Sequence, residues 1–396
     1  MPESCPLTVE WSTGRISHRR EGSSTALDKE ADMATTAEPQ TTSEATRGPT
    51  LAKGWGTDAP DQPLRPMEFE RRALRPDDVA IKITYAGICH SDLHTARNDW
   101  GGTRYPCIPG HEIVGTVTAI GDEVTRHRVG DTVAVGCMVD SCMECDQCLE
   151  GWEVFCRKGC VQTYNSADYH DGTISKGGYT DHIVVRDHFV CKVPDGMDVS
   201  KVAPLLCAGI TTYSPLRQYD VGAGSKVAVI GLGGLGHMGV KLAAAMGAHV
   251  TMITTTPSKG EDARALGAHD VIISTDPEQM AAAATRFDFI LNTIPVSHEI
   301  DGYLQLLGRS GRMVIVGALT PMPGFLGFNI IWWNRAVGGS AIGGIPETQE
   351  MLDFCAAKDI YPDVEFIRMD EVNEAYERLL KNDVRYRFVI DMAQGL

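Results

Sequence analysis

Long hydrophobic runs are missing from this chain, and basic residues are in the minority. No apolar stretch approaches the roughly 18 residues of a membrane-spanning helix, and the N-terminal region lacks the apolar run of a secretory signal. Lysine and arginine number 36 against 52 aspartates and glutamates, a net charge of −16, which argues against nucleic acid or an anionic membrane as partner. Twelve cysteines in 396 residues are few for a disulfide scaffold. We therefore expect a protein of the reducing cytoplasm with neither nucleic acid nor membrane as partner.

The first 50 residues differ in composition from the rest of the chain. Serine, threonine, glutamate and alanine dominate them, as in T-T-A-E-P-Q-T-T-S-E-A-T, and the near absence of apolar periodicity predicts a disordered extension over residues 1–50. The remaining length is enough for two domains. An apolar content of 43% with 41 glycines is typical of a globular α/β protein.

The secondary-structure pattern changes once along the remaining residues. Short alternating segments with glycine turns, starting at Asp78, predict a compact, barrel-like first domain over residues 51–200, and Gly87 is expected to end the first strand. From Lys226 onward, apolar strands alternate with helical stretches, which predicts a doubly wound parallel sheet over residues 201–344. Its strands are expected near residues 226–230, 249–255, 270–273, 287–291 and 312–316.

The segment from Cys89 to Gly121 carries residues that can bind a metal. Cys89, His111 and Glu112 offer a thiolate, an imidazole and a carboxylate. A catalytic zinc takes three protein ligands of these kinds and leaves a fourth position open for water or substrate. Taken alone, Cys89 is better interpreted as a buried core thiol and His111 as a hydrogen-bonded histidine, so the metal assignment depends on the rest of the chain.

A second metal site is indicated by four closely spaced cysteines. Cys142, Cys145, Cys148 and Cys156 are separated by two, two and seven residues, and four thiolates form a closed tetrahedral zinc site with a structural role. The alternative is an iron–sulfur cluster, whose ferredoxin pattern needs a three-residue gap before the fourth cysteine and a proline after it. Here Arg157 follows Cys156, so the spacing favours zinc.

Glycines after the strand at 226–230 form a G-x-G-x-x-G pattern. An apolar strand precedes it and a helix is expected over residues 236–246, which is the context of a dinucleotide-binding turn. The first glycine permits the turn, the second lets the backbone approach a pyrophosphate, and the third lets the helix pack on the strand. The residues expected to contact the cofactor here are Gly231, Gly233, Gly234, Leu235 and Gly236.

The end of the following strand indicates which cofactor is bound. NAD-binding units place an aspartate or glutamate about 20 residues beyond the glycines, but here the sequence reads T-T-T-P-S-K. The hydroxyls of Thr255, Thr256 and Ser258 and the ammonium group of Lys259 suit a 2′-phosphate, so we expect NADP(H) in preference to NAD(H). A polar turn with a solvated lysine is the alternative interpretation.

Taken together, these motifs resemble the zinc-containing medium-chain alcohol dehydrogenases. The stretch G-H-E-I-V-G-T-V-T-A-I-G-D-E-V matches that family's zinc signature, and the resemblance runs from about Trp55 to the end. Further motifs, among them G-I-C-H-S-D-L-H and P-L-L-C-A-G-I-T-T-Y-S-P, bring it nearest to the cinnamyl alcohol dehydrogenase group and its microbial NADP-dependent aldehyde reductases. The resemblance implies a GroES-like β-barrel catalytic domain, which residues 345–396 complete after an inserted Rossmann domain.

The resemblance also implies roles for individual residues. The catalytic zinc ligands would be Cys89, His111 and Cys207, with Glu112 as a neighbouring carboxylate that can bind zinc. Ser91 and His94 would relay a proton, and Asp92 would orient His111. Further cofactor contacts are expected from His90, Thr211, Thr293, Gly317, Ala318, Ser340 and Ile342. The substrate pocket would be bordered by Trp100, Cys137, Trp332 and Trp333.

The activity implied is hydride transfer between NADP(H) and aldehydes or primary alcohols, aromatic or broad in range, with two zinc ions per subunit. Zinc would polarise the carbonyl oxygen, the nicotinamide would deliver hydride, and Ser91 and His94 would pass a proton. Two alternatives are a zinc-free quinone or enone reductase, which would lack the ligands, and a non-catalytic binding protein, which would not need the relay. We also expect a homodimer, with the apolar run Ile330–Ile345 as its interface.

Overall fold

The computed structural model of the chain describes residues 48–317 and 319–396. The disordered extension expected over residues 1–50 therefore falls almost wholly outside the described residues, and strand β1 already begins at Thr50. Among the helices of the described ranges, none combines the length and hydrophobicity that crossing a bilayer requires.

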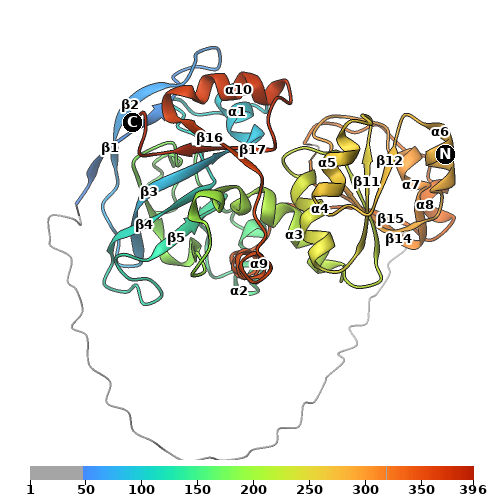
Figure 1. Cartoon of the computed structure of the whole chain (residues 1–396). Coiled ribbons are helices and arrows are strands. Elements are labelled where there is room, and N and C mark those ends of the chain that lie inside the picture. The colour runs from blue at the N-terminus through green and yellow to red at the C-terminus, as the bar shows by residue number, and fades with distance from the viewer. Residues whose placement is uncertain (1–47, 318) are drawn as a thin grey trace, which may run out of the picture. The chain divides into compact units, whose positions relative to one another are not determined.

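A seven-stranded, mostly antiparallel sheet is the first of the two main sheets. Its strand order is β16-β17-β3-β4-β5-β9, with β8 paired to β3 (Figure 1). The C-terminal strand β17 joins this sheet because it pairs antiparallel with β3. The strands span β3 Asp78–Ile88, β4 Ile113–Ile120, β5 Thr132–Val135, β8 His182–Arg186, β9 Val190–Lys192, β16 Val364–Arg368 and β17 Arg387–Asp391.

Short elements surround this sheet, and most of the predicted metal ligands lie next to them. Two small antiparallel ladders join β1 to β2 and β6 to β7. Their bounds are β1 Thr50–Gly56, β2 Arg65–Arg71, β6 Met138–Asp140 and β7 Val161–Gln162. The helices of this part are α1 His90–Ala96, α2 Asp146–Leu149, α9 Ile345–Lys358 and α10 Val372–Leu380, with single 3-10 turns at Glu153–Phe155, Asp187–Phe189, Val199–Lys201, Ala203–Leu206 and Met369–Glu371.

The second main sheet is six-stranded and parallel, in the order β12-β11-β10-β13-β14-β15. The chain enters it through helix α3, and helices flank the sheet on both sides (Figure 1). Its strands are β10 Lys226–Ile230, β11 His249–Thr254, β12 Asp270–Ile273, β13 Phe287–Asn292, β14 Leu307–Ile315 and β15 Ala336–Gly339. The helices are α3 Ala208–Gln218, α4 Gly236–Ala245, α5 Lys259–Ala265, α6 Pro277–Ala282, α7 Asp301–Leu304 and α8 Phe328–Ile331.

The run V-A-V-I in β10 shows why this sheet is covered on both faces. Successive side chains of a strand point to opposite faces, and all four residues are buried. Val227 and Val229 belong to the main hydrophobic core, whereas Ala228 and Ile230 belong to a second core with Ile253. A continuous apolar strand therefore packs against helices on each side, as parallel sheets require.

The predicted fold class, a GroES-like β domain with a Rossmann-type parallel sheet, is confirmed by these two sheets. One local expectation is wrong: Gly87 does not end its strand, because β3 continues to Ile88. The domain boundaries at residues 200 and 344 stay predictions.

Candidate active site

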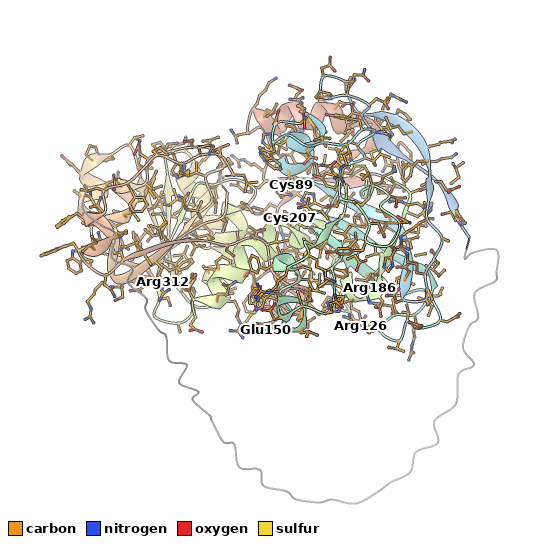
Figure 2. All side chains as sticks on the ribbon, turned by 180° about the vertical axis from the view of Figure 1, so that it is seen from behind. Cys89, Arg126, Glu150, Arg186, Cys207 and Arg312 are labelled. Atoms are coloured by element: carbon orange, nitrogen blue, oxygen red, sulfur yellow. The ribbon has the colours of Figure 1, made fainter. Side chains whose placement is uncertain are left out.

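Three chain segments bring the first predicted ligand set together. Cys89 precedes helix α1, His111 and Glu112 precede strand β4, and Cys207 precedes helix α3. One ligand atom from each of the four side chains lies within 4.8 Å of the others. The sulfur atoms of Cys89 and Cys207, 118 residues apart in sequence, are 3.9 Å apart, and the two cysteines are neighbours in Figure 2.

The Asp92 carboxylate connects parts of this cluster through hydrogen bonds. The carboxylate is fully buried, and its Oδ1 lies 2.9 Å from His111 Nδ1 and accepts the Gly110 N–H at 3.0 Å. Its Oδ2 accepts the Cys89 N–H at 3.0 Å and the Tyr179 hydroxyl at 3.1 Å. With Nδ1 held by a carboxylate, Nε2 of His111 is the nitrogen left to bind a metal.

Burial and neighbouring charges shift the pKa values in this cluster. The hydrogen bond from Cys207 lowers the pKa of the Cys89 thiol well below its usual value, against the effect of burial. Burial disfavours a protonated His111, but Asp92, Cys137 and Cys89 together raise the pKa of that imidazole well above its usual value. A thiolate next to an imidazole and a second thiol is the donor set that zinc prefers.

Glu112 is buried beside this cluster and pairs with a residue from the far end of the chain. It forms an ion pair with Arg387 in β17, and both side chains are almost completely buried. Burial raises the pKa of Glu112 to about 7, although Arg387 opposes the shift. Glu112 Oε2 has no hydrogen-bond partner in the described residues, and a buried acceptor without a partner indicates a missing donor or cation.

Gly87 gives Glu112 its space. A Cβ atom at position 87 would lie 2.0 Å from Glu112 Oε2, which no real side chain allows. The glycine therefore serves a close approach inside β3 rather than a turn, and this is the physical reason why the strand does not end there.

The four cysteines expected to form the second site also lie together. Their sulfur atoms are all within 4.8 Å of one another, and backbone N–H groups of Cys142 and Arg157 donate to Cys156 and Cys145 at 3.5 Å each. The Arg157 N–H lowers the pKa of Cys145 to about 6, while burial raises the pKa of Cys148 to about 12. All four can be thiolates at once only if a cation offsets their mutual repulsion.

The glycine turn after β10 has the geometry of a phosphate-binding loop. Gly231 has φ +91°, and a Cβ at Gly236 would lie 1.8 Å from the Gly231 carbonyl oxygen, whereas a Cβ at Gly233 would meet no atom within 4 Å. The first and third glycines are therefore required by the turn and its helix, and the second leaves open space for a ligand. A Cβ at Gly234 would lie 2.9 Å from Arg387 Nη1, which places this cation at the turn.

The residues predicted to read the 2′-phosphate lie beside that turn. Thr255, Thr256 and Ser258 are exposed after β11, and Lys259 Nζ donates to the Leu232 carbonyl at 3.4 Å. Lys259 thus reaches the glycine loop, and the three exposed hydroxyls precede it in the chain.

The other predicted cofactor residues take different positions. Thr293 is buried and donates to the Ile230 carbonyl at 2.8 Å, next to the glycine turn, and Gly317 packs against the Thr293 backbone. Thr211 is buried in α3, His90 begins α1 and is partly buried, and Ser340 and Ile342 follow β15. Ala318 lies outside the described residues, and these roles stay predictions.

Ser91 and His94, the predicted relay, both lie on α1. The Ser91 hydroxyl is 3.7 Å from Cys89 Sγ, and His94 Nδ1 is 2.7 Å from Asp99 Oδ2 with part of the ring exposed. Within the described residues no hydrogen bond joins the two side chains directly. Ser91 therefore borders the ligand cluster and His94 faces solvent, as a relay would need.

The predicted pocket residues divide into two groups. Cys137 hydrogen-bonds Cys207, which lowers the pKa of Cys137, and Trp100 packs on His94 with ring centroids 5.2 Å apart. Trp332 and Trp333 lie instead on an exposed apolar segment that precedes β15.

Comparisons with known proteins agree with this geometry. Residues 75–195 match the alcohol dehydrogenase GroES-like domain, and residues 234–357 match the zinc-binding dehydrogenase family. The chain is 53% identical to the aldehyde reductase YahK of Escherichia coli over 341 residues, 86% of this chain and 97% of that protein. The chain belongs to the zinc-containing medium-chain alcohol dehydrogenases.

Other members of this alcohol dehydrogenase family show the same likeness. NADP-dependent alcohol dehydrogenase C 1 of Mycolicibacterium smegmatis is 52% identical, over 84% of this chain and 95% of that protein. A cinnamyl alcohol dehydrogenase of Helicobacter pylori, solved with NADP(H), is 43% identical with a TM-score of 0.83, covering 88% of this chain and all of that one. The predicted kinship with the cinnamyl alcohol dehydrogenase group is confirmed.

Sequence reasoning missed two residues of this dehydrogenase site. Arg387 lies between Glu112 and the glycine turn, and its only signal was an arginine in the last predicted strand. Tyr164, whose ring centroid is 5.9 Å from that of His111, follows the four-cysteine segment in a stretch without a recognisable motif.

Proposed function

We propose that this protein is a zinc-dependent oxidoreductase that transfers hydride between NADP(H) and aldehydes or primary alcohols. The observation that carries the proposal is the cluster of Cys89, His111 and Cys207 beside Glu112, which Arg387 connects to the glycine turn. A three-ligand metal site next to a dinucleotide loop is the arrangement that hydride transfer to a polarised carbonyl requires.

The residues of the open cluster fit zinc. Two sulfurs and one imidazole nitrogen make three ligands, and the unpartnered Glu112 Oε2 lies beside them. When bound there, zinc supplies Lewis acidity to a carbonyl or alkoxide oxygen at its fourth position. Asp92 holds Nδ1 of His111, and the burial of the cluster residues excludes bulk water.

Two side chains of α1 would transfer the proton between the reacting oxygen and solvent. The Ser91 hydroxyl, bordering Cys89, would hydrogen-bond the reacting oxygen and donate or accept its proton. His94, partly exposed and held by Asp99, would exchange that proton with solvent, a role suited to an imidazole near neutral pH.

The four-cysteine cluster fits a second, closed zinc with a structural role. Its four cysteines would fill a tetrahedral coordination shell and leave no position for substrate. Such a site needs reduced thiols, so we place the protein in a reducing compartment, the cytoplasm.

The cofactor preference tests the proposal most directly. With benzaldehyde as substrate, kcat/KM for NADPH should exceed that for NADH by at least about tenfold, or about 1.4 kcal/mol. Lys259→Ala should narrow this gap mainly through KM for NADPH, because a charge contact to the 2′-phosphate is lost. The measurement is the initial rate of cofactor oxidation, followed by its absorbance.

The matched control is Lys226→Ala, which removes a lysine at the opposite end of β10 from the glycine turn. It should leave both constants unchanged. Equal use of NADPH and NADH by the wild type would refute the cofactor assignment, and absence of turnover with either would refute the proposed function.

The exposed apolar segment before β15 supports self-association. Ile331 and Trp332 are 77% and 61% exposed, with Leu319, Leu326 and Phe328 also exposed nearby, and β15 is an edge strand of the parallel sheet. Apolar patches of this kind are typical of interfaces, so we propose a homodimer through this segment.

The dimer can be tested by light scattering at micromolar concentration. The wild type should have twice the mass of the chain, and Ile331→Glu should shift it to the monomer, because a charge at an apolar interface is costly. Leu149→Glu, at a comparably exposed leucine in α2, should not. A monomeric wild type would contradict this part of the proposal.

A further inference from the structure

Residues 163–175, between β7 and β8, form a loop with a fixed internal shape, here called the brace. The Asn165 N–H donates to the Ser175 carbonyl at 3.0 Å, and the Ser175 N–H donates to the Ser166 carbonyl at 2.7 Å. The two arms of the loop thus satisfy each other's backbone groups in the manner of a hairpin. A displacement of one arm therefore carries the other with it.

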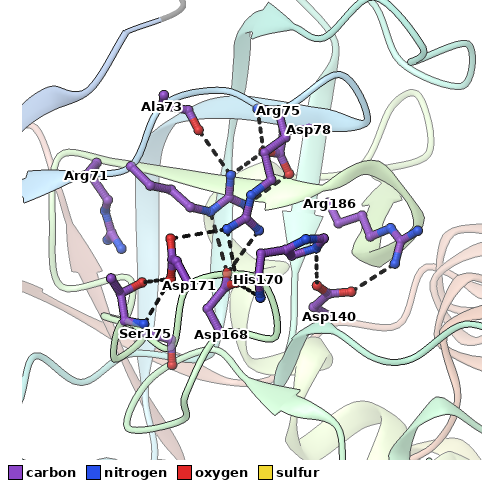
Figure 3. Close-up of polar contacts among 12 residues, drawn as sticks. Arg71, Ala73, Arg75, Asp78, Asp140, Asp168, His170, Asp171, Ser175 and Arg186 are labelled. Atoms are coloured by element: carbon purple, nitrogen blue, oxygen red, sulfur yellow. Dashed lines mark hydrogen bonds and ion pairs between the residues drawn. The ribbon is translucent and has the colours of Figure 1, made fainter.

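An arginine clamps the brace to the main sheet. Arg75, just before β3, donates from its two terminal nitrogens to the two carboxylate oxygens of Asp168, at 3.0 Å each, and lies 3.4 Å from Asp171 (Figure 3). Both partners of the main pair are largely buried. Bidentate pairs of this kind fix orientation as well as distance.

One arm of the brace reaches the open ligand cluster. Tyr164 is 7% exposed, and its ring lies against the His111 imidazole with 5.9 Å between centroids and a 33° tilt. Asp92 holds the Nδ1 edge of that imidazole and Cys89 hydrogen-bonds it from the ligand cluster, but contacts at the ring edges alone leave the plane of the ring free to turn. The packed face of Tyr164 removes that freedom.

The rest of the brace is anchored at two more points. The Asn165 Oδ1 accepts the Arg104 N–H at 2.8 Å, in the segment that leads to His111. At the tip, the Tyr169 hydroxyl is 3.7 Å from Cys156 Sγ in the four-cysteine cluster. The loop therefore contacts both ligand clusters and the sheet between them.

We propose that the brace, held by the Arg75–Asp168 clamp, uses Tyr164 to keep the His111 imidazole in its metal-binding orientation. Tyr164 is then a positioning residue that governs how firmly the Cys89–His111–Cys207 site holds zinc. The inference rests on the zinc site of the proposed function and adds to it a determinant of metal retention that touches neither substrate nor cofactor.

The test is zinc release from the purified full-length protein into an excess of a chromogenic chelator. The wild type should release two equivalents in two phases, the faster from the site with an open position. Tyr164→Ala should accelerate the fast phase about tenfold or more, the lower end of what outer-shell partners of metal-binding histidines contribute. Asp168→Asn, which weakens the clamp, should accelerate it less, and the slow phase should stay unchanged in both.

Two variants serve as matched controls. Tyr164→Phe keeps the ring against His111 and should release zinc at the wild-type rate. Asp58→Asn removes an exposed ion pair with Arg65 in neither cluster and should also behave as the wild type.

The proposed role of the brace would be overturned by a fast phase that is unchanged in folded Tyr164→Ala, or by an equal acceleration of both phases. If Tyr164→Ala does not fold, Asp168→Asn decides by the same criterion. If the wild type holds two zinc ions but the substitutions leave the release rates unchanged, only this inference is refuted. A wild type without zinc would refute the proposed function as well.

Discussion

Arg387→Leu is expected to lower the free energy of unfolding by about 3–5 kcal/mol, the cost of removing one partner of a buried ion pair. The reason is that Glu112, fully buried, would lose its compensating cation and would have to stay charged without a partner or take up a proton. Denaturant unfolding of the metal-loaded variant and wild type, with the midpoint and slope compared, measures the difference.

Glu112 provides the control for this prediction. Glu112→Gln removes the charge that Arg387 compensates, so the double variant Arg387→Leu/Glu112→Gln should be more stable than Arg387→Leu alone. If Arg387→Leu caused the same loss in the wild-type protein and in the Glu112→Gln variant, the ion pair would not be its cause.

Ser91→Ala is expected to reduce kcat for aldehyde reduction by about a hundredfold or more, the usual contribution of a positioned proton donor. The Ser91 hydroxyl borders Cys89 and thus the position of the reacting oxygen. His94→Gln should cost much less, because His94 is partly exposed and solvent can replace a group that only connects to it. Steady-state kinetics at saturating NADPH give both values.

Ser91→Thr retains a hydroxyl on the same helix and should keep more activity than Ser91→Ala. Zinc content should be equal in all of these variants, because none of them removes a ligand. Wild-type rates in Ser91→Ala would remove the serine from the proposed mechanism.

The parts of the site that could be predicted from sequence are those whose residues lie close together in the chain. Cys142, Cys145 and Cys148 lie within seven consecutive residues, so their spacing alone indicates that they bind the same metal ion. The glycines at 231, 233 and 236 likewise form one turn, whose φ of +91° at Gly231 follows from local sterics. Cys207 became predictable only through family resemblance, because 118 residues separate it from Cys89.

The positions of Arg387 and Tyr164 depended on tertiary structure. Arg387 meets Glu112 across 275 residues because β17 pairs antiparallel with β3, with Val389 opposite Gly87. Hydrophobic periodicity identifies a strand but does not state its partner or register. Tyr164 reaches His111 through a loop whose shape is set by hydrogen bonds and by the Arg75 clamp, none of which leaves a periodic signal.

The sequence by itself therefore determined the fold class, the two ligand sets and the dinucleotide turn, because each depends on local spacing, on an apolar pattern or on a family motif. The tertiary structure alone decided which buried cation balances Glu112, why Gly87 is a glycine, and which aromatic ring holds His111. These features arise where distant segments approach within a few ångströms, and strand pairing and side-chain packing determine that approach.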